Sequence, residues 1–133
     1  MKTTRIMATA LLLVGSGLTL QMAQAQQLEI QRTDILQQDL GVPGREAVQA
    51  RVDFKPGAVS IKHSHPGEEV AYVLEGSLEY QLEGRPPVTL KAGEALFIPA
   101  GVAHVAKNVG SGKASELATY IVNKGTALVV PVK

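Results

Sequence analysis

The residue types in this sequence that are best suited to chemistry are its three histidines and one nearby glutamate. His63 and His65 are separated by one residue, so on a β-strand both imidazoles point to the same side. Glu69 follows a Pro-Gly turn, where the chain can reverse and bring a carboxylate back beside them. His104 begins a strand after a Pro-x-Gly turn of its own. Three neutral imidazoles and one carboxylate suit one first-row divalent ion.

Two alternatives accompany this hypothesis. In the first alternative, the histidines are ordinary surface or core residues. Against it, all three fall at patterned positions. Glu68 replaces Glu69 in the second, but it is one residue out of phase and faces away if Glu69 faces inward. The expected ligands are therefore His63, His65, Glu69 and His104. Manganese, iron, nickel, cobalt, copper and zinc all remain possible, and the absence of cysteine excludes thiolate catalysis and cysteine-ligated clusters.

Short strands must position these residues, because alternating segments are separated by turn signals every 8–12 residues without a helical period. The expected strands cover residues 48–54, 59–65, 69–74, 78–82, 88–90, 95–98, 102–108 and 117–122, with a further edge strand at 128–130. This pattern predicts an all-β sandwich or barrel over residues 45–133. Residues 26–44 are interpreted as an N-terminal arm, with room for one strand, that packs on the barrel or on a partner subunit.

The first 25 residues have the features of an export signal. Lys2 and Arg5 precede an apolar stretch over residues 6–20, and Ala23-Gln24-Ala25 supplies a small-x-small cleavage site. A membrane anchor is the alternative, but the apolar stretch is shorter than the ~20 residues that span a bilayer. We therefore predict a cleaved signal peptide at residues 1–25 and a periplasmic or secreted mature protein.

The charge balance argues against two classes of partner. The chain has 13 basic and 12 acidic residues, and removal of Lys2 and Arg5 leaves a mature chain close to neutral. Without a basic run there is no electrostatic footprint for nucleic acid. No membrane partner is expected after signal cleavage. The expected partner is a small-molecule ligand or substrate.

The candidate ligands lie in two stretches of fixed spacing. The first reads Gly57-x5-His63-x-His65-x3-Glu69-x6-Gly76, and the second reads Gly93-x5-Pro99-x-Gly101-x2-His104-x3-Asn108. Both stretches resemble the two cupin motifs at every fixed position, and the short spacer between them resembles that of single-domain bacterial cupins. The resemblance implies a double-stranded β-helix, or jelly-roll barrel, and a homodimer. The motif glycines, Pro99 and Asn108 are interpreted as structural residues.

The cavity around the ligands can be outlined by strand phase. Its expected lining is mostly apolar: Val59, Ile61, Ala71, Val73, Val102 and Ala106. Phe97 and the strand face bearing Tyr80 or Tyr120 are expected to close its mouth.

Three functions are compatible with such a site. The resemblance to quercetinase-type cupins implies a metal-dependent, dioxygenase-like oxidoreductase, with Glu69 acting as ligand and as catalytic base. A non-catalytic periplasmic module that binds a metal or small ligand would need the same residues. A lyase or isomerase is third, because it needs a further acid or base and no fourth histidine exists.

Overall fold

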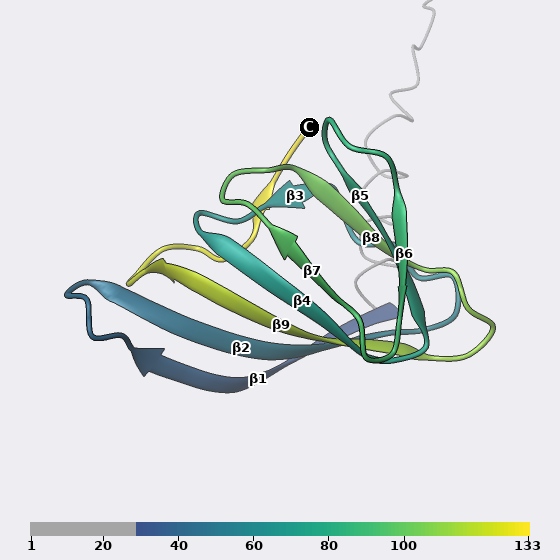
Figure 1. Ribbon diagram of the computed structural model, residues 1–133, viewed down its shortest axis with the longest axis horizontal. Coiled ribbons are helices and arrows are strands. Elements are labelled where there is room, and N and C mark those ends of the chain that lie inside the picture. Colours follow the sequence, from purple (N-terminus) through teal and green to yellow (C-terminus); the bar gives the residue numbers. More distant parts are fainter. Residues whose placement is uncertain (1–28) are drawn as a thin grey trace, which may run out of the picture.

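The computed structural model describes residues 29–133, which form two five-stranded antiparallel β-sheets (Figure 1). The first sheet has the strand order β1 (Ile30–Asp39), β2 (Arg45–Phe54), β9 (Ala114–Asn123), β4 (Glu68–Glu75) and β7 (Ala95–Ile98). The second has the order β10 (Val130–Pro131), β3 (His63–Ser64), β8 (His104–Asn108), β5 (Ser77–Leu82) and β6 (Val88–Lys91). Except for β1–β2 and β5–β6, consecutive strands lie in different sheets. This topology confirms the predicted all-β jelly roll.

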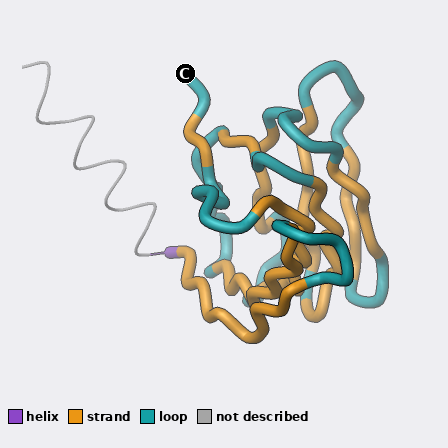
Figure 2. Tube along the Cα trace, turned by 90° about the vertical axis from the view of Figure 1, so that its left-hand side faces the viewer, coloured by secondary structure: helices purple, strands orange, loops and turns teal. Residues whose placement is uncertain are grey.

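Strand β1 lies within the segment that the sequence assigns to an N-terminal arm. It pairs with β2 along its whole length, from Ile30 opposite Phe54 to Asp39 opposite Glu46. The side view in Figure 2 shows strands and connecting loops making up nearly all of the described chain. The division between arm and barrel stays a prediction, and the predicted export signal at residues 1–25 lies outside the described residues. No helix within residues 29–133 is long and apolar enough to cross a bilayer.

Strict alternation of apolar side chains builds the core between the sheets. Every second residue of β2 is buried, and the same holds for β5 and for the second half of β9. The buried residues on these three strands include Val48, Ala50, Val52, Phe54, Leu78, Tyr80, Leu82, Ala118, Tyr120 and Val122. Inward faces of this kind remove apolar surface from water, and this burial is the main favourable contribution to folding.

The strand predicted over residues 59–65 is wrong in extent, because only His63–Ser64 forms β3. Upstream of it the chain still runs beside β8, through an isolated bridge between Val59 and Lys107. There the Ser60 hydroxyl accepts a hydrogen bond from the Ala106 amide at 2.9 Å. A side chain therefore occupies a place that a regular ladder gives to a backbone carbonyl, and the regular pairing is interrupted.

Asn108 is a structural residue, as the sequence predicts. It is 1% exposed, and its Nδ2 lies within 3.1 Å of the carbonyl oxygens of Phe54, Lys55 and Gly112. Its Oδ1 accepts a hydrogen bond from the Gly110 amide at 3.0 Å. One buried amide thus joins the end of β2 to the loop after β8, and it satisfies backbone groups that would otherwise be buried without partners.

The predicted glycine corners are confirmed, since Gly57, Gly76, Gly93 and Gly101 all have positive φ. Gly76 is the most constrained of them. Its φ is +74°, and a Cβ there would lie 2.6 Å from the Lys113 carbonyl oxygen. Only glycine fits this corner without strain or a clash.

Candidate metal centre and its cavity

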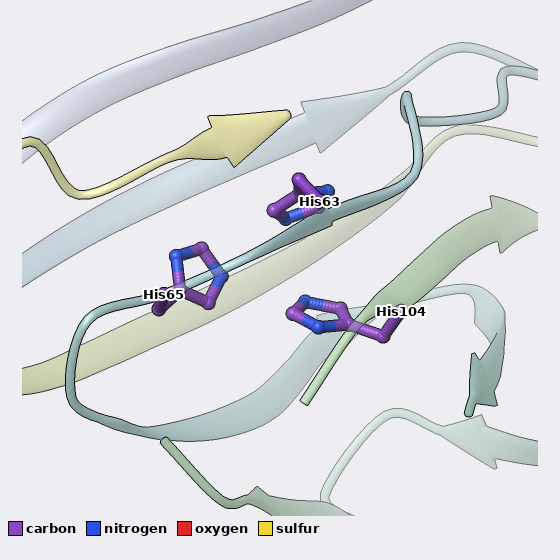
Figure 3. Close-up of side chains that lie close together, drawn as sticks. All are labelled: His63, His65 and His104. Atoms are coloured by element: carbon purple, nitrogen blue, oxygen red, sulfur yellow. The ribbon is translucent and has the colours of Figure 1, made fainter. Parts of the chain in front are cut away.

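The structure brings the three histidines together. His63 lies in β3, His65 follows that strand directly, and His104 is the first residue of β8. His63 and His104 are direct partners across the β3–β8 pair. One ring nitrogen from each histidine lies within 4.8 Å of the other two, and Figure 3 shows the three rings around a common space. Atoms that share one ion lie at most about 4.4 Å apart, so only small movements would close the site.

Each histidine is oriented by a backbone carbonyl. The Nδ1 atoms of His63, His65 and His104 lie 2.7, 2.5 and 3.0 Å from the carbonyl oxygens of Ile61, Leu128 and Val102 respectively. Carbonyl oxygens only accept hydrogen bonds, so each Nδ1 carries the proton. The Nε2 atoms are then left with free lone pairs, which is the form of histidine that binds a metal ion.

Glu69 completes the cluster from β4 in the opposite sheet. It is 3% exposed, and its Oε2 lies 2.9 Å from the Nε2 of His65 and 3.5 Å from that of His104. The Oε2 of Glu69 and the Nε2 of His65 are nevertheless buried without a hydrogen-bond partner. Buried polar atoms without partners are costly. An ion at this point would satisfy both, so the donor set fits a divalent metal.

Glu68 and Glu69, the first two residues of β4, point in opposite directions. Glu68 keeps 43% of its side chain exposed and lies 3.5 Å from the Arg45 guanidinium. Only Glu69 faces the histidines, in agreement with the phase argument from the sequence.

Two pKa values describe the charge state of the cluster. Burial is the main cause that lowers the pKa of His63 to about 4, and the neighbouring His104 and His65 act in the same direction. Burial also opposes ionisation of Glu69, but the adjacent His104 and His65 rings outweigh it and hold the pKa of that carboxyl at about 2. At neutral pH the site therefore presents a neutral His63 and an ionised Glu69, the forms that bind a cation.

The first prediction concerns the metal-free protein, whose thermal stability should fall as the pH drops from about 6.5 toward 4. Unfolded chains protonate His63 near pH 6.5, whereas folded chains do so only near pH 4, so in this window the unfolded state binds more protons. The melting temperature, measured across this range, reports the loss. A His63→Gln variant should show a shallower slope, and an identical slope in both proteins would contradict the prediction.

A cavity of about 260 Å³ adjoins the cluster. The residues that line it come from both sheets: Ile30, Arg32, Val52, Phe54, Val59, Ser60, Ile61, His63, Glu69, Tyr80, His104, Ala106, Glu116, Tyr120 and Val129. The expected lining is right for Val59, Ile61 and Ala106, and both Tyr80 and Tyr120 contribute.

The rest of the expected lining is wrong. Ala71 and Val73 are fully buried in the core, and Val102 packs against that core. Phe97 does not close the mouth, because it is 54% exposed. Phe97 is the cross-strand partner of Val70, which is also exposed, so both side chains face away from the interior.

The sequence interpretation missed three contributors to the site. Glu116 lines the cavity, is 5% exposed and accepts a hydrogen bond from the Tyr80 hydroxyl. Leu128 orients His65 through its carbonyl. The Arg32 guanidinium lies 5.6 Å from the centre of the Tyr120 ring at the cavity wall. Glu116 had a detectable signal, since it shares the inward phase of Ala118 and Tyr120.

Comparison with models of known protein families identifies the family to which this fold belongs. The model described as "Cupin domain" matches residues 50–120, more than half of the chain. The chain belongs to the cupin family. The match includes all three histidines and Glu69, so the candidate metal centre of this cupin lies inside the family domain.

Curated relatives of this cupin include both plant and bacterial proteins. "Germin-like protein subfamily 2 member 2" of Arabidopsis thaliana is 37% identical over 87 residues, which cover 59% of this chain and 40% of the relative. "Dimethylsulfoniopropionate lyase DddQ" of Ruegeria pomeroyi is 40% identical over 63 residues, covering 47% and 31% respectively. The chain thus spans less than half the length of these curated relatives.

Solved structures show the same likeness. An oxalate oxidase structure matches with a TM-score of 0.64 and 26% identity, covering 78% of this cupin and 55% of that chain. The DMSP lyase DddQ from Ruegeria pomeroyi matches with a TM-score of 0.65 and 25% identity, covering 77% and 51%. A cupin-like protein from Thermotoga maritima, with a TM-score of 0.64 at 24% identity, shows the fold alone.

Proposed function

We propose that this cupin is a metal-dependent oxidoreductase that acts on a small organic molecule, with His63, His65, Glu69 and His104 as ligands of one divalent ion. The observation that carries the proposal is the convergence of three oriented imidazoles, two of which lie against the Glu69 carboxylate, beside a mostly apolar cavity. A divalent ion bound there would supply Lewis acidity and, for a redox-active metal, electron transfer. Its identity is left open by this donor set.

The protein residues have separable tasks in this proposal. The three carbonyl-anchored histidines hold their Nε2 atoms in place, and Glu69 contributes the negative charge. Val52, Phe54 and Ile61 line the cavity with apolar surface, which strengthens electrostatic interactions by keeping water out. Glu69 is also the proposed catalytic base, although its pKa of about 2 makes it a weak proton acceptor.

Substrate size follows from the cavity. At about 260 Å³ it lies below the range of about 300–1,000 Å³ typical of sites for drug-sized ligands. Single-ring enols and catechols are therefore better first candidates than flavonol-like compounds. The oxalate oxidase likeness supports an oxidoreductase, but it covers only part of that protein.

Oxygen uptake is the direct test. Protein loaded separately with manganese, iron, cobalt, nickel, copper and zinc would be screened with enols, catechols and flavonol-like compounds in an oxygen electrode. We expect substrate-dependent uptake with at least one redox-active ion, and at least a ~100-fold lower rate for His104→Ala, because loss of a ligand costs more than the ~10–100-fold seen for outer-shell residues. Tight metal retention without turnover would instead favour the non-catalytic binding module.

A lyase is the second candidate, and one observation in the structure makes it stronger than the sequence alone suggested. In the sequence, no further acid or base could be identified for a lyase reaction. The structure places such a group, the hydrogen-bonded pair Glu116 and Tyr80, in the cavity wall. The likeness to the lyase DddQ is consistent with this alternative. Product formation at an undiminished rate under strictly anaerobic conditions would identify a lyase and rule out the oxidoreductase.

Two further proposals concern the setting of the protein. Export, with cleavage after residue 25 and a periplasmic or secreted mature chain, rests on the N-terminal sequence. A homodimer rests on the family resemblance and is supported by an apolar outer face of β4 and β7, where four side chains are exposed: Val70, Tyr72, Leu74 and Phe97.

A further inference from the structure

Glu116 and Tyr80 form a polar contact across the interior of the barrel. Glu116 lies on β9 of the first sheet and Tyr80 on β5 of the second, and the Tyr80 hydroxyl donates a hydrogen bond to the Glu116 Oε2. Both residues are almost fully buried, with exposed fractions of 5% and 1%. Both also line the cavity beside the histidine cluster.

The remaining carboxyl oxygen of Glu116 has no hydrogen-bond partner in the part of the chain that the structure describes. Within residues 29–133, Oε1 makes no hydrogen bond, and it is absent from the buried polar atoms that lack a partner, so it retains access to the cavity. A second buried glutamate provides a contrast. Glu46 is also 5% exposed, but it accepts a hydrogen bond from Gln37 and lies outside this cavity.

The surroundings keep the pair uncharged. Burial and, to a lesser degree, the negative charge of Glu69 raise the pKa of the Glu116 carboxyl to about 8. Burial and the neighbouring Glu116 also raise the pKa of Tyr80. A neutral carboxylic acid that receives one hydrogen bond has its own O–H left to donate.

We propose that Glu116 and Tyr80 form a subsite that binds an oxygen atom of a small, otherwise apolar ligand by hydrogen bonding. The proposal rests on the proposed function, since it describes recognition in the same cavity. The remaining walls offer Val52, Phe54 and Ala106, which suit a hydrocarbon ring or short chain. The ligand class is therefore a small phenol, enol or carbonyl compound whose oxygen reaches the Glu116 carboxyl.

A pair of probes isolates this subsite. Phenol carries the hydroxyl, and fluorobenzene has a similar size without it. Binding of both to metal-free and to zinc-loaded protein would be followed by NMR, using the methyl groups of Ala106 and Val52 as reporters of the cavity. We expect the wild-type protein to prefer phenol by at least about fivefold, in line with about 1 kcal/mol for one neutral hydrogen bond.

Substitutions then assign that preference. Glu116→Leu should remove it, so that both probes bind equally, and Glu116→Gln should keep most of it because the amide still donates. Tyr80→Phe, which removes only one hydroxyl, should reduce the preference at least about twofold and serves if the leucine variant fails to fold. The matched control is Glu46→Leu, which replaces an equally buried glutamate outside the cavity and should leave the preference unchanged.

Three results would overturn the subsite: equal binding of the probes by wild-type protein, binding that leaves the Ala106 and Val52 methyl signals unshifted, or an unchanged preference in both Glu116→Leu and Tyr80→Phe. The metal-free measurements separate this inference from the proposed function. A hydroxyl preference in protein that shows no turnover with any ion would support the subsite and refute the oxidoreductase. Turnover by a protein without the hydroxyl preference would support the oxidoreductase and refute the subsite.

Discussion

Replacing His104 with alanine is expected to abolish stoichiometric metal binding. The substitution removes one of three oriented Nε2 donors and leaves Glu69 buried without the ring that lies 3.5 Å away. We expect metal affinity to fall at least ~100-fold, because even outer-shell partners of a metal ligand contribute ~10–100-fold. Metal content per chain, measured by elemental analysis, should approach zero after dialysis.

Thermal stability should change in the same experiment. A ligand that binds only the folded state stabilises it by about 2.7 kcal/mol when present at 100 times its dissociation constant. Added metal should therefore raise the melting temperature of the wild-type protein but not that of His104→Ala. The same direction is expected for His63→Ala and His65→Ala.

The matched control lies three residues away on the same strand. Lys107→Ala removes an exposed side chain of β8 and should leave both metal content and the metal-induced rise in melting temperature unchanged. Retention of one ion per chain by the His104→Ala protein would refute the proposed ligand set.

Gly67→Ala is expected to damage the fold and the metal site together. Gly67 lies in the turn between His65 and Glu69, and a Cβ there would lie 2.0 Å from the Ile121 carbonyl oxygen and 2.9 Å from a Val122 methyl group. The first contact is with backbone, so the turn must move away from β9. Overpacking of this kind costs ~1–3 kcal/mol or more, and a 1 kcal/mol loss lowers the melting temperature of a domain this size by several degrees.

The displaced turn carries two of the four proposed ligands, so metal affinity should fall with stability. Chemical denaturation measures the free energy of unfolding, and isothermal titration measures the metal affinity. Gly112→Ala is the control, because a Cβ at that position has no neighbour within 4 Å and its φ lies outside the left-handed region. If the two variants had equal stability and affinity, the packing argument for Gly67 would be wrong.

The fold could be predicted from the sequence because apolar and polar residues alternate along its strands. Val48 to Phe54 on β2 and Leu78 to Leu82 on β5 alternate between buried apolar residues and more accessible polar ones, so their inward faces could be identified without coordinates. The segment 59–65 was overextended because alternation cannot reveal that the Ser60 hydroxyl replaces a ladder carbonyl. That exchange depends on the neighbouring strand.

The cavity was only partly predictable, for a related reason. Strand phase separates inward from outward residues but does not give their depth along the barrel. Ala71 and Val73 do point inward, yet they pack in the filled part of the core rather than beside the ligands. Phe97, expected at the mouth, instead lies on the outward phase of its strand beside exposed Val70.

By itself, the sequence determined the all-β fold class and the inward phase of the candidate ligands, because both follow from periodicity and spacing within a few residues. Tertiary structure alone decided what surrounds them. The Leu128 carbonyl orients His65 across 63 residues, and Glu116 meets Tyr80 across 36. Such contacts depend on how two sheets face each other, and no local pattern specifies that arrangement.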